Sequence, residues 1–163
     1  MKVRHIENGD WNRIIEIQKQ SYPVTLIESK GSLQAKEMTS TDTCFVVEID
    51  EEVEGYLLAM PYMIGKSPSI NSEERNYKND GNLHIHDFCI SASHKKNGYG
   101  RKIITDLISA SSFKCFKSIS VVSVMKSRYF WESMGLSIFE QKEPQTLSTY
   151  GKDAIYLSME LSQ

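Results

Sequence analysis

Two histidines, His84 and His86, are separated by one residue in the apolar segment from Asn82 to Ser91. Side chains two residues apart on a strand point to the same face, so we expect the two imidazoles about 7 Å apart. The ordinary histidine pKa of about 6.5 allows an imidazole to accept a proton at neutral pH. An alkylammonium must lose a proton before its nitrogen can attack, so the pair predicts a water relay acting as general base.

Two other interpretations of the pair remain open: structural histidines with hydrogen-bonded ring nitrogens, and a metal site completed by a carboxylate. Asp87 is predicted to point to the opposite face of the strand, so it cannot join a metal shell with the histidines. We therefore predict no metal. Cys89 is expected to face away from the histidines as a core residue, because nothing nearby would activate it as a nucleophile.

A basic turn with two glycines follows this segment and reads Lys95-Lys96-Asn97-Gly98-Tyr99-Gly100-Arg101. It lies between a predicted strand and a predicted helix, where backbone N–H groups lack partners and the helix dipole attracts anions. The glycines let the backbone approach a diphosphate closely. The turn lacks the patterns of nucleoside triphosphate and dinucleotide sites, which predicts another phosphate carrier. The alternative is a solvated helix start with incidental glycines.

Hydrophobic periodicity predicts the sheet that must position these residues. Expected strands cover residues 2–6, 44–49, 53–60, 82–91, 118–124, 138–141 and 155–159. Expected helices begin after Asp10 and cover 26–38, 98–112 and 127–134. Residues 63–81 are polar and aperiodic, so we expect a mobile functional loop. This order predicts an α/β fold: a twisted mixed sheet of about seven strands, with about four helices on both faces and a right-handed parallel crossover within residues 82–124.

Composition restricts the class of protein. The chain has 163 residues, 40% hydrophobic and 25% charged, which predicts one globular domain over residues 1–163. A net charge of −2 provides no general attraction to nucleic acid or to an anionic membrane. With no signal peptide and no long apolar run, we expect a cytoplasmic protein. Cys44, Cys89 and Cys115 form no C-x-x-C pair and are expected to be reduced.

The segment from Leu83 to Ile90, followed by Lys95 to Gly100, resembles motif A of the GNAT superfamily of N-acetyltransferases, Q/R-x-x-G-x-G/A after a strand of the form L-x-V. Residues 130–136, F-W-E-S-M-G-L, resemble the F-Y-x-x-x-G-F segment of that family. With the matching order of elements, the resemblance covers nearly the whole chain. Leu-His-Ile-His is also similar to the strand of serotonin (arylalkylamine) N-acetyltransferases, which carry a His-x-His relay. Elsewhere the chain looks more like uncharacterised bacterial GNAT proteins.

The resemblance implies acetyl-CoA as co-substrate and assigns roles to residues. The backbone of Phe88, Cys89 and Ile90 would hold the pantetheine arm and orient the thioester. The pyrophosphate would lie against the basic turn, that is, against Lys95, Lys96, Asn97, Gly98, Tyr99, Gly100 and Arg101, with Lys95 in a place where Gln or Arg is common. The residues Tyr22, Glu28, Tyr62 and Trp131 would border the acceptor groove, with Glu28 holding the cation of an amine.

Trp131 departs from the family pattern, because many GNAT enzymes have a tyrosine at this position to protonate the CoA thiolate. Tyr129 lies two residues away, about 200° round a helix, and is expected to face elsewhere. A thiol pKa of about 8.5 makes thiolate a tolerable leaving group, so catalysis without a dedicated acid is expected.

The main hypothesis is an N-acetyltransferase that joins acetyl-CoA and a primary amine in a ternary complex without a covalent intermediate. The alternatives are an acyl-CoA-binding or sensing protein without chemistry, and a protein acetyltransferase acting on lysine or an N-terminus. A small-molecule amine is the favoured acceptor, and a homodimer is one option for the assembly.

Overall fold

The computed structural model describes residues 1–75, 79–110, 115–140 and 144–161, apart from the side chains of 144–146. Within these residues seven strands form one sheet in the order β1-β2-β3-β4-β5-β7-β6. The strands are β1 (Lys2–His5), β2 (Phe45–Ile49), β3 (Glu52–Pro61), β4 (Asn82–Ile90), β5 (Ser118–Ser123), β6 (Ser137–Ile138) and β7 (Ile155–Glu160). Strands β4 and β5 are parallel, and the other neighbours are antiparallel. The predicted mixed sheet is thus confirmed.

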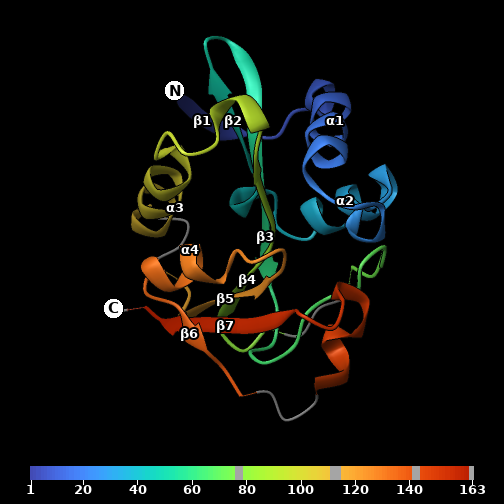
Figure 1. The fold of residues 1–163 in the computed structure, drawn as a ribbon, viewed down its shortest axis with the longest axis vertical. Helices are drawn as coiled ribbons and strands as arrows, with labels where there is room; N and C mark the ends of the chain where they lie inside the picture. The colour runs from blue at the N-terminus through green and yellow to red at the C-terminus, as the bar shows by residue number, and fades with distance from the viewer. Residues whose placement is uncertain (76–78, 111–114, 141–143, 162–163) are drawn as a thin grey trace.

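Helices cover both faces of this sheet (Figure 1). The α-helices among the described residues are α1 (Trp11–Ser21), α2 (Lys30–Glu37), α3 (Tyr99–Ser109) and α4 (Arg128–Ser133). Short 3-10 helices are η1 (Asn8–Asp10), η2 (Val24–Leu26), η3 (Thr41–Thr43), η4 (Ala92–His94) and η6 (Pro144–Tyr150). Apolar residues of α1 and α2 form one buried cluster, and those of α3 and α4 form another on the opposite face. The predicted arrangement of helices is confirmed. None of the described helices has the length and apolar character needed to cross a membrane.

Three predicted elements are shorter than expected. The helix predicted over 26–38 begins at Lys30, because the Ser29 hydroxyl caps its first turn by accepting a hydrogen bond from Ser32 N at 3.1 Å. Glu28 therefore lies in the segment before α2, not on a helix. The helix predicted over 98–112 ends at Ser109, and residues 111–112 lie outside the described part. The strand predicted over 138–141 is the short β6, and residue 141 is likewise not described.

A β-bulge in β4 changes the direction of its side chains. Opposite β3, Leu58 pairs with Asp87 and Ala59 pairs with Ile85, so His86 is the extra residue. Both His86 and Asp87 consequently face the side of α1 and α2: His86 bonds Glu28, and Asp87 accepts a hydrogen bond from the Tyr56 hydroxyl at 2.7 Å. The prediction that Asp87 faces away from the histidines is wrong, because strict alternation fails at a bulge.

The bulge also turns Cys89 to the side of α1, where it belongs to the same buried cluster as Tyr56. Cys89 was predicted to face away from the histidines. It lies on the same side of the sheet as His86, so that prediction is wrong. The thiol is 5% exposed, and burial raises its pKa to about 11. Such a thiol is almost entirely uncharged at neutral pH, which agrees with its interpretation as a core residue.

Strands β4 and β5 separate after a short ladder. Asn82–Ile85 pair in parallel with Ser118–Val121, and in the described strands this ladder extends no further. Strand β4 continues to Ile90, whereas β5 continues alongside β7 up to Ser123. The carboxyl ends of two parallel strands thus diverge, which is a position where α/β folds bind ligands.

The segment predicted as a mobile loop is bound to the rest of the fold in the residues that the structure describes, 63–75 and 79–81. Gly65 N donates to the Tyr156 hydroxyl at 3.0 Å, and Ile70 N donates to Thr149 Oγ1 at 3.1 Å. Asn71 N donates to Glu28 Oε2 at 2.8 Å. These contacts fix the segment between η6, β7 and the residues before α2.

Candidate functional site

A cleft of about 410 Å³ opens where β4 and β5 diverge. One wall consists of the consecutive residues 86–90 of β4, and another comes from the end of β5, the residues that follow it, and α4. Lys95, the first residue of the basic turn, also lines the cleft. Far from it in sequence, residues around η2, the segment 63–75 and η6 complete the lining with Leu26, Glu28, Ile70 and Tyr150. We call this second group the acceptor end.

The basic turn is open to solvent. Residues 95–98 are exposed, and Gly98, with φ of 77°, is the residue before α3. An added Cβ at Gly98 would meet nothing within 4 Å, so the glycine serves the left-handed backbone and not a close contact. Lys96 also has a positive φ, 69°. The turn therefore presents the first N–H groups of an eleven-residue helix next to the cleft.

Two of the basic side chains near the turn contact other residues. The guanidinium of Arg101 donates to the Ser133 carbonyl oxygen at 3.0 Å and to Ser133 Oγ at 2.7 Å. Lys102 pairs with Asp106 one helical turn away, at 2.8 Å. Arg101 was expected to contact a phosphate, but in this structure its side chain joins α3 to the end of α4.

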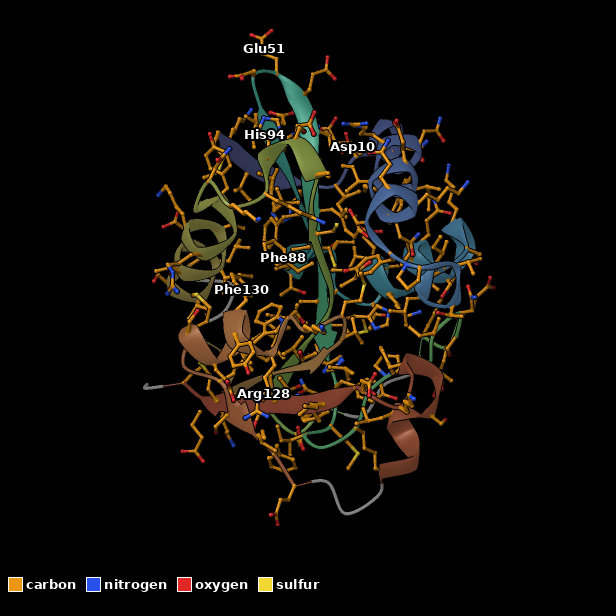
Figure 2. The ribbon with its side chains drawn as sticks, viewed as in Figure 1. Asp10, Glu51, Phe88, His94, Arg128 and Phe130 are labelled. Carbon is orange, nitrogen blue, oxygen red and sulfur yellow. The ribbon has the colours of Figure 1, made fainter. Side chains whose placement is uncertain are left out.

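Three aromatic rings lie together beside the cleft. Figure 2 labels Phe88 and Phe130, whose ring centroids are 6.3 Å apart in a stacked arrangement. Trp131 meets Phe88 edge-on at 6.2 Å and is 5% exposed. An added Cβ on Gly100 would lie 3.6 Å from both Phe88 and Phe130, so the start of α3 packs directly on these rings. Tyr129 is 79% exposed and faces away, as predicted.

His84 and His86 share a face, with ring centroids 6.4 Å apart, but their environments differ. His84 is fully buried, its Nδ1 lies 2.9 Å from Ser120 Oγ, and its ring stacks on Tyr156. Its Nε2 has no hydrogen-bond partner among the described residues. Burial lowers the pKa of His84 to about 3, so this imidazole is a poor proton acceptor at neutral pH.

Tyr62 lies beside His84, with ring centroids 6.1 Å apart, and partial burial raises the pKa of its phenol. Neither His84 nor Tyr62 is among the described residues that line the cleft. The expected position of Tyr62 at the acceptor groove therefore differs from its observed position.

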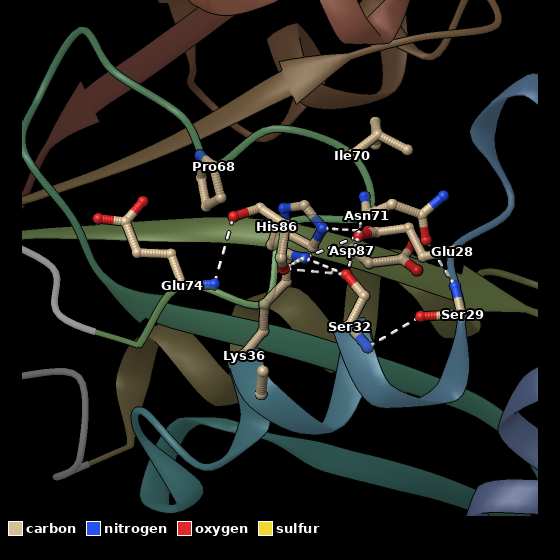
Figure 3. A network of polar contacts seen from close by, with 12 residues as sticks. Glu28, Ser29, Ser32, Lys36, Pro68, Ile70, Asn71, Glu74, His86 and Asp87 are labelled. Carbon is tan, nitrogen blue, oxygen red and sulfur yellow. Dashed lines mark hydrogen bonds and ion pairs between the residues drawn. The ribbon is translucent and has the colours of Figure 1, made fainter.

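Glu28 is at the centre of a buried polar network (Figure 3). Its Oε2 accepts hydrogen bonds from Lys36 Nζ at 2.7 Å, Ser32 Oγ at 2.6 Å and Asn71 N at 2.8 Å, and its Oε1 bonds His86 Nε2. Burial raises the pKa of Glu28, but the contacts with His86 and Lys36 outweigh it and hold the pKa well below its usual range. The carboxylate is therefore an anion at neutral pH.

Lys36 is the countercharge of this carboxylate and is fully buried. Its ammonium donates to Glu28 Oε2, to Ser32 Oγ at 2.7 Å and to the Ser72 carbonyl oxygen at 2.8 Å, which matches its three N–H groups. Glu28 was expected to border the acceptor groove and hold the cation of an amine. It does line the cleft, but its carboxylate is buried and already bonded to Lys36 and His86. Lys36 itself carries no sequence signal, because a lysine in a short amphipathic helix normally lies in solvent.

Tyr22 reaches the cleft from the end of α1. Its hydroxyl donates to Asp87 Oδ1 at 2.7 Å, and the Tyr56 hydroxyl donates to Asp87 Oδ2. Burial raises the pKa of Tyr22 well above its usual value, so the phenol stays protonated. Burial also raises the pKa of Asp87, against the opposing effect of the two hydroxyl groups. In the part of the chain that the structure describes, no group of three His, Cys, Asp or Glu side chains could hold a metal ion.

Tyr150 is a cleft residue that the sequence analysis missed. It belongs to η6, is 7% exposed, and its hydroxyl donates to the Pro68 carbonyl oxygen at 2.5 Å. The same hydroxyl oxygen lies 3.3 Å from His86 Nδ1. Burial raises the pKa of Tyr150 well above its usual value. Nothing local marks this tyrosine, because the fold brings it to a residue 64 positions earlier in the chain.

Comparison with known proteins gives the context of this geometry. The model of the acetyltransferase (GNAT) family matches residues 11–136. None of the curated proteins compared with this chain matches its sequence.

Solved structures share the fold at low sequence identity. Ard1 from Thermoplasma volcanium has a TM-score of 0.75 at 12% identity, over 99% of this chain and 98% of that one. GphF, a GNAT-like decarboxylase in complex with isobutyryl-CoA, has a TM-score of 0.77 at 12% identity, over 99% and 100%. Arabidopsis thaliana Naa50, in complex with the bisubstrate analogue CoA-Ac-MVNAL, has 0.72 at 10% identity, over 98% of each chain. At such identities the likeness extends to the fold alone.

Proposed function

The chain belongs to the acetyltransferase (GNAT) family, for which acetyl-CoA is the co-substrate, and we propose that it acetylates a primary amine. Both substrates are bound together, the amine nitrogen attacks the thioester carbonyl directly, and no acyl-enzyme forms. His86 is the general base. A cytoplasmic location, a single catalytic domain over residues 1–163, and the likeness of the His-x-His strand to serotonin N-acetyltransferases stay predictions.

One observation carries this proposal: the cleft between the diverging ends of β4 and β5 joins the basic turn to a histidine. The co-substrate would lie along Phe88 to Ile90, whose β5-facing edge is open beyond the short parallel ladder. The diphosphate would lie on the N–H groups of the turn at Lys96 to Gly100, with Lys95 adding charge. The residues present fit an acyl-CoA, because an apolar wall is continuous with an anion-binding helix start.

His86 is favoured over His84 as the base. His86 lines the cleft and bonds an anionic carboxylate, whereas His84 is buried with a pKa of about 3. We therefore retain the histidine base but propose that His84 has a structural role. It supports the sheet through Ser120 and Tyr156.

The acceptor is proposed to be a small molecule. Ile70 lines the acceptor end, and its segment is fixed through the contacts of Ile70 N and Asn71 N. The segment 63–75 thus covers one side of the cleft and restricts the space through which a polypeptide would enter. This counts against a protein acetyltransferase. It also supports a substrate short enough to fit between Leu26, Ile70 and Tyr150.

The test is release of free thiol from acetyl-CoA in the presence of a panel of small amines, next to calorimetric binding of CoA. We expect turnover with at least one amine, and His86→Gln is expected to lower kcat by at least about 100-fold with CoA affinity unchanged. His84→Gln is the matched control and is expected to change kcat far less. Tight CoA binding without thiol release from any amine would favour the acyl-CoA sensor instead. No CoA binding would contradict both.

A further inference from the structure

Tyr150, His86 and Glu28 form a continuous hydrogen-bonded line that reaches the cleft, and all three line it. The side chains of His86 and Glu28 are 1% and 3% exposed. The two ring nitrogens of His86 face Tyr150 and Glu28, so a proton that arrives at Nδ1 comes through the Tyr150 hydroxyl. The His86 ring lines the cleft, but Tyr150 faces its Nδ1, so a base that acts through Nδ1 needs this phenol.

The hydroxyl of Tyr150 has one hydrogen and faces two acceptors, the Pro68 carbonyl oxygen and His86 Nδ1, and the side chain of Ser67 is hydrogen-bonded to it as well. Pro68 O is 2.5 Å away, and His86 Nδ1 is 3.3 Å away. The hydrogen therefore points to Pro68, and the Tyr150 oxygen accepts from Nδ1–H. Because Nε2 faces a carboxylate, it too needs a hydrogen. The arrangement that satisfies every contact has hydrogen on both nitrogens of His86, which is the state after a proton has been taken up.

The state before uptake needs only a rotation about the Tyr150 C–O bond. With hydrogen on Nε2 alone, Nδ1 becomes an acceptor and the hydroxyl hydrogen turns from Pro68 to His86. Ser67 remains bonded to the Tyr150 hydroxyl, and the lone pair that Nδ1–H occupied is then available to accept a hydrogen from an amine in the cleft. The carbonyl of Pro68 thus provides a second position for the same hydrogen.

We infer that Tyr150 is a catalytic residue that takes a proton from the substrate ammonium as it passes its own to His86, with Glu28 as the positioning residue. The inference rests on the proposed function and adds residues to the same site. In this step one ammonium N–H bond breaks, one O–H bond forms on Tyr150, and the former O–H hydrogen is transferred to Nδ1. Tyr150 ends as a neutral phenol that donates to Pro68.

The remaining steps balance without a further acid. The neutral amine attacks the carbonyl carbon, a C–N bond forms and the C–S bond breaks. The attached nitrogen then loses its second proton to the departing sulfur. His86 returns its proton through the Tyr150 hydroxyl to water in the cleft. A dedicated acid is not needed at the position of Trp131, where many family members have a tyrosine.

The surroundings of His86 suit a transient cation. Titratable groups face it from every element packed around it: Glu28 before α2, Lys36 behind Glu28, Tyr150 in η6, and Asp87 and His84 on its own strand. Glu28 is the nearest anion, and it is fixed by Lys36, Ser32 and Asn71 N. The carboxylate holds Nε2–H and so keeps Nδ1 directed at Tyr150.

The test removes the Tyr150 hydroxyl alone. Tyr150→Phe is expected to lower kcat by about 100-fold and to leave the CoA dissociation constant and the amine KM nearly unchanged. Tyr156→Phe is the matched control: it removes another buried hydroxyl that contacts the same segment, through Gly65 N, and kcat should stay within about threefold.

A second readout does not depend on turnover. In protein with ¹⁵N-labelled histidine, the Nδ1 resonance of His86 should shift in Tyr150→Phe, whereas the resonances of His84 should not.

The role of Glu28 is tested with a double variant. Glu28→Gln combined with Lys36→Met removes both partners of the ion pair, so no buried charge is left alone. This variant should also shift the Nδ1 resonance of His86, because the carboxylate that orients the ring through Nε2 is gone.

The possible outcomes separate the inference from the proposed function. Tyr150→Phe with wild-type kcat and an unchanged His86 resonance would overturn the relay while the acetyltransferase stands. A wild-type protein that releases no thiol with any amine would overturn the proposed function and the relay with it. A shift of the His86 Nδ1 resonance in Tyr150→Phe would then show only that the two side chains are in contact. Reduced kcat with a shifted resonance supports the relay.

Discussion

The two ends of the cleft are built in opposite ways. The basic turn is one contiguous run whose first four residues, 95–98, are exposed, with a left-handed glycine before a helix. The acceptor end is assembled from distant segments. Its buried Glu28 bonds Lys36 and Ser32 of α2, Asn71 N and His86 of β4, so both oxygens of the carboxylate are engaged. An exposed contiguous site tolerates change and depends on backbone shape. A buried site depends on every partner, so one substitution there should affect folding as well as chemistry.

The largest expected effect is at Lys36. Lys36→Met leaves the Glu28 carboxylate buried without its countercharge, and we expect a loss of about 3–5 kcal/mol in the free energy of unfolding. Urea denaturation would measure it. Adding Glu28→Gln to Lys36→Met should restore most of that loss, since no unpaired charge remains. Equal stability of the single and double variants would show that the pair is not coupled as the geometry requires.

A smaller effect concerns His84, which separates the structural histidine from the proposed base. Its pKa is about 3 in the folded state and 6.5 for the ordinary group. Between pH 3 and pH 6.5 the imidazole is therefore protonated in the unfolded chain and neutral in the folded one. Stability therefore falls as pH decreases from 6.5 towards 3. From pH 6.5 to 5 this group alone should cost about 2 kcal/mol. Urea denaturation of His84→Gln over that range should show a shallower slope, and parallel slopes would contradict the assignment.

At the turn, Gly98→Ala should lower the free energy of unfolding by about 1 kcal/mol, because alanine is strained at a φ of 77°. The same change should weaken CoA binding, since the N–H groups of the turn lose their alignment. Gly9→Ala, at a glycine with no neighbour within 4 Å and no positive φ, is the control. Calorimetry with CoA checks the affinity. Unchanged binding in Gly98→Ala would exclude this turn as the diphosphate site.

The smallest effect is expected at Arg101. It distinguishes the predicted contact of Arg101 with phosphate from its observed contact with Ser133. If the guanidinium stays on Ser133, Arg101→Ala should weaken CoA binding by less than about threefold. Lys95→Ala, which removes the cation lining the cleft, should weaken it more, and the loss should shrink at high salt. A loss of more than about tenfold for Arg101→Ala would mean that the side chain leaves Ser133 to bind phosphate.

The sequence predicted the sheet, the placement of the helices and the position of the turn, because these depend on local periodicity. It failed first at the bulge: alternation placed Asp87 opposite His86, and one extra residue in β4 put both on the same side. It failed again at Glu28, where helical spacing extended α2 past the Ser29 cap. In both cases a local rule was correct on average and was overridden by one backbone irregularity.

By itself, the sequence determined that a glycine-bearing helix start follows a central strand and that two histidines lie on that strand. Both are properties of neighbouring residues. The tertiary structure alone decided which histidine opens on the cleft and that Glu28, Lys36 and Tyr150 belong with it. The physical reason is burial: partners brought from distant segments set the charge and the proton acceptor, and their separation in sequence leaves no local pattern.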